Sequence, residues 1–414
     1  MSAAGFAIDG CTPQRIESPA TIDELAHYAA SAHAANLAIV PVGNGTQLHI
    51  GRPPARYDLA LSTQRLNRVL AHEAADMTVT VEAGITLAAL NAALARAGQR
   101  LPLDPPHPEC TTIGALIATD ACGPLRLSHG KVRDLLIGIT VVLADGTLAH
   151  GGGRVVKNVA GYDLMKLFTG SFGTLGIIVE ATFKLRPVAE HETVFVMPAA
   201  EPGAAIALGH EVLNAPVAPY YVEAVNAAAA ACVGLEGSAV VVGCGGSAEE
   251  IAVQRERLKH GILHGNLRVC DAAEAARLYA ALRDFPADSS GGEGACGCKV
   301  SVLPPQLASL LTRAEEAAAH HKVELMILTH VGSGVAVMRF NNSAADQLPS
   351  IAEWLRTTVR AAGGWAVFDL LPTRLKDRID PWGAEPPGLQ LMRGIKRTLD
   401  PNGCLSPGRL VGGM

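Results

Sequence analysis

The stretch Lys157-Asn158-Val159-Ala160-Gly161-Tyr162-Asp163-Leu164-Met165-Lys166-Leu167-Phe168-Thr169-Gly170-Ser171-Phe172-Gly173-Thr174-Leu175-Gly176-Ile177-Ile178 decides the fold. Its four glycines lead into a β-branched run that continues with Val179. Glycine permits positive φ and lets a flat ligand approach the backbone, whereas β-branched residues favour a strand. The pattern therefore predicts a glycine-rich turn that opens into a strand.

A second glycine loop, Pro41-Val42-Gly43-Asn44-Gly45-Thr46-Gln47, follows a short apolar strand expected over 38–42. Consecutive backbone N–H groups with little steric cover can form a nest for phosphate oxygens. The loop is not a P-loop, because no Gly-Lys-Ser/Thr follows, and Leu48 stands where a dinucleotide-binding G-x-G-x-x-G has its third glycine. By itself the loop fits either a phosphate site or a plain tight turn.

A third segment, from Cys110 to Pro124, interleaves small residues with hydroxyls. Small residues would let the backbone lie against a pyrophosphate or an isoalloxazine ring, and Thr111, Thr112 and Thr119 could hydrogen-bond to it. The alternative is a buried helix that packs closely through glycine and alanine. The residues of this segment alone leave both interpretations open.

Composition limits the class of protein. The chain has 414 residues, 49% of them hydrophobic, which is enough for two or three domains with large cores. The net charge is −5 and no Lys/Arg cluster stands out, so neither a nucleic acid nor an anionic membrane surface is an expected partner. No apolar run approaches a membrane span and no leader is evident, so we expect a cytoplasmic protein.

Nine cysteines without a C-x-x-C pair fit reduced thiols, and no metal site is expected. The close pair Cys296-Gly297-Cys298 follows an expected exposed loop over 289–297. His260 and His264 have i, i+4 spacing, but Gly261 lies between them, and a solvated helix end is the preferred interpretation.

Helix and strand signals alternate at short intervals up to Pro187, and longer alanine-rich helices alternate with strands beyond it. This change predicts a second domain of antiparallel sheet and helices. The expected elements are helices over 21–35, 86–97, 199–213, 226–233, 248–259 and 272–283, and strands over 79–81, 137–143, 239–242 and 323–329.

The three glycine-rich segments, in this order, resemble the FAD-binding domain of the vanillyl-alcohol oxidase and p-cresol methylhydroxylase superfamily. The resemblance covers about residues 14–189. The run over 157–164 and the tail Asp400-Pro401-Asn402-Gly403-Cys404-Leu405-Ser406-Pro407-Gly408-Arg409 resemble its 2-hydroxyacid branch. More narrowly, the whole chain resembles the smaller FAD-binding subunits of three-subunit bacterial glycolate oxidases.

The resemblance implies an α+β protein: a two-subdomain PCMH-type FAD-binding domain over 14–189, an antiparallel α+β cap domain over 190–399, and a tail over 400–414 that returns to the FAD domain. It implies a pyrophosphate on the loop over 43–46 and the adenine and ring near 176–178. The implied cofactor contacts are Pro41, Gly43, Asn44, Gly45, Thr46, Gln47, Thr111, Thr112, Ile113, Gly114, Thr119, Gly123, Gly173, Gly176, Ile177, Ile178 and Arg409.

Two departures from the family pattern bear on the cofactor. Thr46 stands where some relatives tether the flavin through a histidine, so FAD is expected to be noncovalent. Asp120 and Pro124 occupy positions where relatives often carry asparagine and glycine, and a carboxylate beside a phosphate would be repulsive.

Catalytic residues are less evident. The larger catalytic relatives carry His-x-Gly-Asp-Gly-Asn-x-His, and this chain keeps His330 but has Ser333 in place of the acid and Val337 in place of the second histidine. One imidazole does not make a divalent metal site, which typically takes three protein ligands. The catalytic residues therefore stay unknown. His330 is a weak candidate for a base, with a structural role as the preferred interpretation. Arg339 is a weak candidate for binding a substrate carboxylate, and Arg126, Arg374 and Arg409 are the other arginines considered for that task.

The sequence therefore predicts an FAD-binding subunit of a 2-hydroxyacid dehydrogenase complex that oxidises glycolate to glyoxylate. The resemblance implies a larger catalytic flavin subunit and an iron–sulfur subunit as partners. It leaves open whether these partners hold the chain peripherally at the inner face of the membrane. Two alternatives are a stand-alone FAD-dependent 2-hydroxyacid dehydrogenase and a non-catalytic scaffold that has lost FAD.

Overall fold

The computed structural model describes residues 3–153, 162–261, 267–288, 295–341 and 347–414. Two compact units emerge from the contacts between residues. Unit 1 comprises residues 1–122, 130–188 and 384–414, and unit 2 comprises 123–129 and 189–383. The domain limits predicted from sequence remain a prediction; the units differ from them in that 384–399 packs with unit 1 and 123–129 with unit 2.

The first layer of unit 1 is a small parallel sheet with strand order β1-β3-β2. Its strands are β1 (Arg15–Glu17), β2 (Ile39–Val42) and β3 (Leu59–Ser62). Helix α1 (Ile22–Ala34) begins at Thr21, whose hydroxyl accepts the N–H of Glu24, and packs Leu25, Ala29 and Ala32 into the core. Because β2 and β3 run parallel, both end at the same edge of the sheet.

The second layer of unit 1 is a five-stranded antiparallel sheet of order β4-β5-β9-β7-β8. Alternate residues of its strands pack against helices on one face. The strands are β4 (Val69–Glu73), β5 (Thr78–Glu82), β7 (Leu136–Val142), β8 (Leu148–Gly152) and β9 (Ile177–Lys184); the main helices are α2 (Leu87–Leu94), α3 (Ile113–Thr119), α5 (Val132–Leu135) and α6 (Leu164–Phe168).

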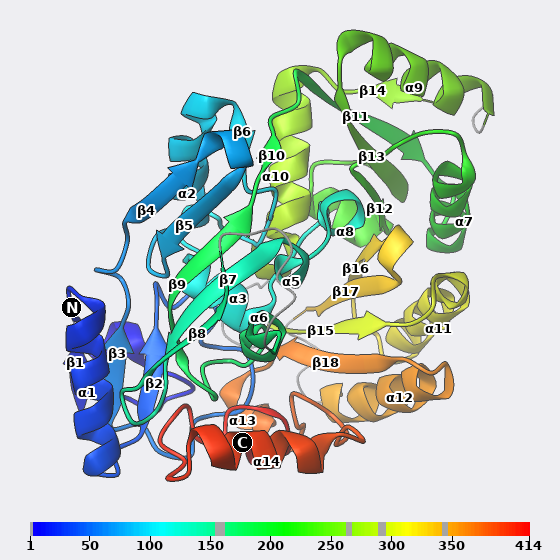
Figure 1. Cartoon of the computed structure of the whole chain (residues 1–414). Helices are drawn as coiled ribbons and strands as arrows, with labels where there is room; N and C mark the ends of the chain where they lie inside the picture. The colour runs from blue at the N-terminus through cyan, green and yellow to red at the C-terminus, as the bar shows by residue number, and fades with distance from the viewer. Residues whose placement is uncertain (1–2, 154–161, 262–266, 289–294, 342–346) are drawn as a thin grey trace. The chain divides into compact units, whose positions relative to one another are not determined.

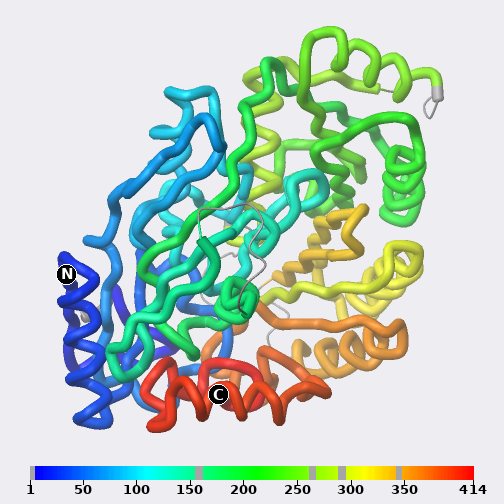
Figure 2. The backbone as a smooth tube through the Cα atoms, viewed as in Figure 1, coloured from blue at the N-terminus to red at the C-terminus, as the bar shows by residue number. Residues whose placement is uncertain are grey.

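The C-terminal segment closes unit 1. After α14 (Leu389–Leu399), residue Leu405 bridges to Ile39 of β2 in parallel, with Ile39 N–H donating to Cys404 O and Ser406 N–H donating to Ile39 O. Figure 2 shows this red segment beside the blue N-terminal strands. Lys396, buried beneath it, donates from Nζ to the carbonyl oxygens of Thr174 (2.7 Å) and Leu405 (2.9 Å). The tail is thus hydrogen-bonded to the loop that opens β9.

Unit 2 is built on an eight-stranded antiparallel sheet of order β14-β11-β13-β12-β16-β17-β15-β18. Figure 1 shows α7, α11 and α12 along one face and α8 and α10 along the other. The strands are β11 (His191–Pro198), β12 (Tyr221–Val225), β13 (Ala239–Gly246), β14 (Arg268–Val269), β15 (Cys296–Ser301), β16 (Leu325–His330), β17 (Val335–Phe340) and β18 (Trp365–Leu370). The helices are α7 (Pro202–Asn214), α8 (Ala227–Cys232), α9 (Ala248–Gly261), α10 (Ala272–Asp288), α11 (Leu307–His320), α12 (Leu348–Ala361), and the short α4 (Arg126–His129) and α13 (Thr373–Lys376).

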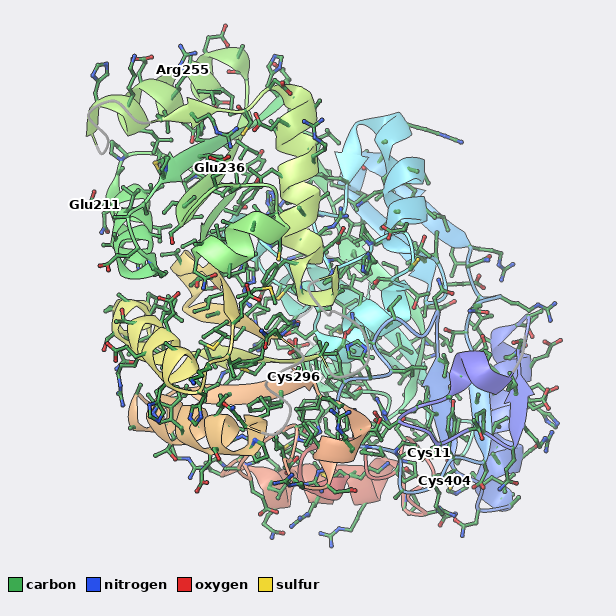
Figure 3. All side chains as sticks on the ribbon, turned by 180° about the vertical axis from the view of Figure 1, so that it is seen from behind. Cys11, Glu211, Glu236, Arg255, Cys296 and Cys404 are labelled. Carbon is green, nitrogen blue, oxygen red and sulfur yellow. The ribbon has the colours of Figure 1, made fainter. Side chains whose placement is uncertain are left out.

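The expected α+β class, with an antiparallel second sheet, is confirmed. One local expectation is wrong: Cys296 (labelled in Figure 3) and Gly297 lie in the buried strand β15, not in an exposed loop. Burial raises the pKa of the Cys296 thiol to about 12 and raises that of Cys298 as well, so both are inert core thiols. The rest of that expected loop, 289–294, and His264 lie outside the described residues.

Candidate functional site

A pocket that is partly open to solvent lies within unit 1, where the two sheets meet. Five chain segments line it: the end of β2 with its loop, the residue after β3, the face of α3, the turn that opens β9, and the tail. The lining residues are Val40, Pro41, Val42, Gly43, Gly45, Thr46, Gln47, Leu48, Thr63, Gly114, Ala115, Ala118, Thr119, Phe172, Gly173, Gly176, Ile177, Ile178 and Arg409.

The loop after β2 offers an anion nest. Among the described residues, no acceptor receives a hydrogen bond from the backbone N–H groups of Asn44, Gly45, Thr46 or Gln47. The Thr46 hydroxyl is buried and likewise has no partner there. Gly45 has φ +77°, which turns the loop at a position that favours glycine. Three of these residues, Gly45, Thr46 and Gln47, line the pocket, and consecutive unpaired N–H groups at a pocket form a nest that suits ligand oxygens.

Helix α3 forms the opposite wall with small side chains. Thr112 caps it by accepting the N–H of Ala115, and an added Cβ at Gly43 would lie 2.3 Å from the Thr112 hydroxyl. Glycine at position 43 is therefore required by the close approach of the loop to this helix. The segment from Cys110 is a helix packed through small residues, and one side of the same helix faces the pocket.

Five predicted contacts do not line the pocket: Asn44, Thr111, Thr112, Ile113 and Gly123. Asn44 instead tethers the loop, donating to Cys110 O and accepting from Gln64. Thr111 donates to Pro106 O, and Ile113 is a core residue. Asp120 ends α3 in the left-handed region, pairs with Lys131 at 3.5 Å and is not among the lining residues, although its neighbour Thr119 is.

Sequence reasoning did not single out Thr63, Phe172 or the α3 residues Ala115 and Ala118 as contacts. Thr63 follows β3, and the parallel pairing of β3 with β2 would have pointed to it, because ligands bind at the carboxyl ends of parallel strands. Phe172 has φ +53°, which the sequence does not reveal. The predicted residues 157–161 lie outside the described part of the chain.

Arg409 holds the end of the loop that follows β2. It is 3% exposed, and its guanidinium donates to the carbonyl oxygens of Leu48 (2.9 Å), Ile50 (2.7 Å) and Arg52 (3.3 Å). Burial lowers its pKa. This side chain therefore shapes the pocket wall through backbone carbonyls.

His330 lies in unit 2, opposite Glu223 in the register of β12 and β16. Its Nδ1 is 2.8 Å and 2.9 Å from the two carboxylate oxygens of Glu223, and both side chains are buried. Burial raises the pKa of Glu223, and the hydrogen-bonded His330 lowers it by a smaller amount. A carboxylate on Nδ1 fixes the imidazole and leaves Nε2 as its other nitrogen.

Arg339 lies in unit 2 as well, in β17, and is 2% exposed. It forms a two-pronged ion pair with Asp369, with both N–O distances at 3.0 Å, and also donates to Pro286 O. All of these partners belong to the protein interior, so the geometry is that of a structural ion pair. Arg339 and His330 form no shared cluster with each other in the described contacts.

The fold and the pocket define a flavoprotein-type architecture. The family model of the FAD binding domain matches residues 13–152, and that of the C-terminal domain of FAD linked oxidases matches 189–365 and 380–410, about half of the chain. The chain belongs to the FAD-linked oxidases, among the FAD-linked 2-hydroxyacid dehydrogenases.

Relatives of known name fall into two groups. D-2-hydroxyglutarate dehydrogenase of Xanthomonas citri pv. viticola is 30% identical over 96% of this chain and 89% of that protein. Glycolate oxidase subunit GlcD of Bacillus subtilis is 37% identical, but over 43% of this chain and 38% of that protein. Glycolate oxidase subunit GlcE of Escherichia coli is 36% identical over 36% of this chain and 42% of that protein. The two glycolate oxidase matches thus span less than half of either relative.

A solved structure of p-cresol methylhydroxylase with bound substrate superimposes with a TM-score of 0.76 at 16% identity, covering 95% of this chain and 88% of that one. At this identity the likeness shows the fold alone. None of the described helices is long and apolar enough to cross a membrane.

The residues present fit FAD. The nest of unpaired N–H groups at 44–47 suits pyrophosphate oxygens, and the small residues of α3 and the turn before β9 leave space for a flat ring. No histidine is among the described residues that line the pocket, and noncovalent attachment of the cofactor stays a prediction.

Proposed function

We propose that the pocket of unit 1 binds FAD, with the pyrophosphate on the N–H groups of residues 44–47. The adenine and the ring would lie towards Gly176, Ile177 and Ile178. The four unpaired N–H groups are the observation that carries this placement. Thr46 would offer its hydroxyl to the phosphate oxygens, since among the described residues that hydroxyl has no other partner.

We further propose that the chain is the FAD-binding subunit of a glycolate-type 2-hydroxyacid dehydrogenase, accessory to a larger catalytic flavin subunit and joined by an iron–sulfur subunit. The match to GlcE supports this subunit role. A bound flavin supplies hydride acceptance in such chemistry. The hydroxyl proton and the substrate carboxylate would then need a base and a cation.

The residues of unit 2 favour the accessory role. His330 is held by Glu223, Ser333 donates its hydroxyl to the carbonyl of His330, and Val337 is a core residue of β17. Among the described residues, His330 therefore belongs to no group of three metal-ligating side chains, which is what a catalytic divalent site takes. Arg339 is committed to Asp369 and is not available to a substrate carboxylate.

A second function is a stand-alone 2-hydroxyacid dehydrogenase. The match to D-2-hydroxyglutarate dehydrogenase, which extends over 96% of this chain, favours it. In that case the His330–Glu223 pair would serve as the base, and Nε2 of His330 would accept the hydroxyl proton of the substrate.

Co-expression tests the subunit role. The tagged chain would be produced with the larger flavin subunit and the iron–sulfur subunit encoded in the same organism, and the purified material analysed by size-exclusion chromatography with light scattering. We expect a stoichiometric complex that carries both flavin and iron. A chain that remains separate under these conditions, and is reduced by a 2-hydroxyacid without them, would support the stand-alone function instead.

A further inference from the structure

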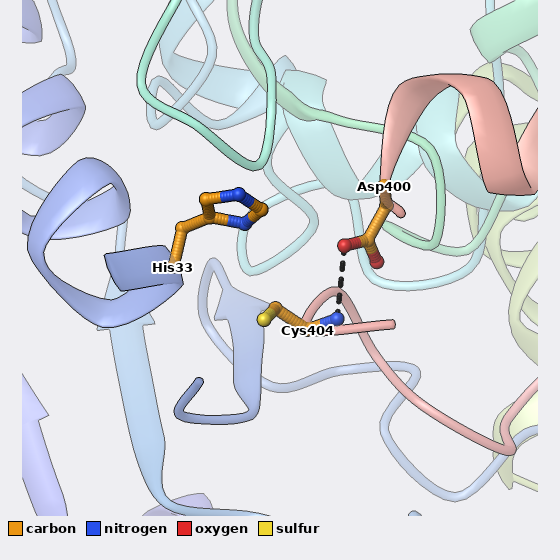
Figure 4. A group of neighbouring side chains, drawn as sticks. All are labelled: His33, Asp400 and Cys404. Atoms are coloured by element: carbon orange, nitrogen blue, oxygen red, sulfur yellow. Dashed lines mark hydrogen bonds between the residues drawn. The ribbon is translucent and has the colours of Figure 1, made fainter. Parts of the chain in front are cut away.

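Three potential metal ligands meet at the base of the C-terminal tail. They are His33 in the last turn of α1, and Asp400 and Cys404 in the turn after α14. One ligand atom from each lies within 4.8 Å of the others, and among the described residues no other group of three or more such side chains does so. Figure 4 shows His33 facing the two tail residues. No sequence pattern predicts this cluster, because 367 positions separate His33 from Asp400.

The hydrogen bonds around His33 point to a missing ligand. Its Nδ1 is buried and has no hydrogen-bond partner among the described residues. Its Nε2 is 3.3 Å from the side-chain nitrogen of Asn402. Rotating that amide by 180° would place its oxygen there, as an acceptor for an Nε2–H, in exchange for the 3.4 Å hydrogen bond that the amide nitrogen donates to His33 O. An imidazole that donates from one nitrogen to an oxygen presents the other as a metal ligand.

Asp400 and Cys404 each keep a ligand position open. The Asp400 carboxylate accepts the N–H groups of Cys404 (2.9 Å) and Leu405 (2.7 Å) and the ammonium of Lys396. A carboxylate accepts about four hydrogen bonds, so one acceptor position remains. The Cys404 thiol is fully buried, and its one recorded contact is a long one, 3.9 Å, to the amide oxygen of Asn36.

We propose that His33, Asp400 and Cys404 bind a zinc ion, and that this ion fastens the C-terminal tail to α1. A set of nitrogen, oxygen and sulfur ligands is one that zinc accepts, and ligands on one zinc lie about 3.5 Å apart, so side-chain rotation would close the site. The Zn–S bond forms as the thiol proton leaves to solvent. The amide oxygen of Asn36, or water, would be the fourth ligand. Through the tail, the ion would stabilise the segment that carries Arg409.

Metal titration of the FAD-loaded full-length chain tests this site. The reduced protein, treated with a chelator and desalted, is titrated with Co²⁺ and followed at wavelengths beyond flavin absorption, where tetrahedral cobalt bound to thiolate absorbs. We expect one Co²⁺ per chain, displaced by Zn²⁺, and a rise in melting temperature with Zn²⁺. Absence of a stoichiometric cobalt spectrum, or no change in melting temperature, would overturn the proposal.

Matched variants assign the ligands. C404S and H33Q should each weaken metal binding by about 100-fold or more, whereas C110S, at an exposed cysteine, should bind as the original chain does. Should C404S fail to fold, H33Q decides, because His33 is partly exposed and tolerates substitution. Binding that survives in both C404S and H33Q, or disappears in C110S, would show an adventitious ion on other thiols.

Discussion

Arg409 donates a 2.9 Å hydrogen bond to the carbonyl oxygen of Leu48, which joins the C-terminal tail to the loop that forms the nest. The same guanidinium holds two further carbonyl groups of that loop, those of Ile50 and Arg52. The pocket is thus made from parts of the chain more than 350 residues apart. Loss of the tail contact should disturb the pocket even though the nest glycines remain.

Arg409→Ala should release the loop over 48–52 and leave buried carbonyl groups without donors. We expect the free energy of unfolding to fall by about 2–3 kcal/mol and the FAD-to-protein ratio to fall with it. Urea unfolding and the visible spectrum measure the two effects. Arg56→Ala, which removes a single exposed hydrogen bond to Asn36 O, is the control and should cost about 0.5 kcal/mol or less. Full flavin occupancy in R409A would contradict this role.

Gly45→Asp should empty the pocket of flavin, because a carboxylate would stand in the nest where the pyrophosphate oxygens are expected. Gly45→Asn is the matched control: asparagine tolerates the positive φ of this position and carries no charge. The measurement is flavin content after purification. Retained flavin in G45N but not in G45D supports the placement, and G45D with full flavin would refute it.

His330→Ala should make stability depend more steeply on pH. Burial raises the pKa of Glu223 and His330 lowers it, so removing the imidazole raises that pKa further. A carboxyl group whose pKa is higher in the folded than in the unfolded state stabilises the protein fully at pH values below its unfolded pKa. This contribution is lost as the pH rises through its folded pKa. We expect H330A to lose about 3–5 kcal/mol near neutral pH and much less near about pH 4.5.

Urea unfolding of H330A across this pH range provides the measurement. The double variant E223Q/H330A removes both members of the titrating pair and leaves only the charge of Arg126 nearby, so its stability relative to the original chain should not show the extra pH dependence. Equal stability losses in H330A at both ends of the range would contradict the assigned pairing.

Arg339→Ala should cost about 3–5 kcal/mol, because it removes the two-pronged partner of the buried Asp369 carboxylate, which keeps only the longer 3.8 Å pair with Lys299. The double variant R339M/D369L removes both charges and should recover most of that stability while keeping flavin and any activity of the complex. Unfolding curves together with steady-state rates check this. Loss of activity in a stable R339M/D369L protein would instead assign Arg339 to the substrate.

The sequence predicted the pocket where glycine patterns or family motifs mark close backbone approach. The loop from Pro41 to Gln47 and the turn with Gly173 and Gly176 indeed line one pocket. Thr112 caps α3, Thr111 donates to Pro106 O and Thr119 donates to Ala115 O, so only the structure shows that all three hydroxyls have partners within the protein. Glu223 was missed because its pairing with His330 depends on sheet register across 107 residues.

Anaerobic reduction of the flavin tests the central claim most directly. The purified chain, alone and in complex with the larger flavin subunit, would be mixed with glycolate, D-lactate or D-2-hydroxyglutarate, and bleaching of the visible flavin band recorded. The account predicts that the chain alone binds FAD that none of these reduces, and that the complex bleaches more flavin than the larger subunit holds by itself. Bleaching of the isolated chain by any of the three would contradict the accessory role and establish a dehydrogenase in its own right.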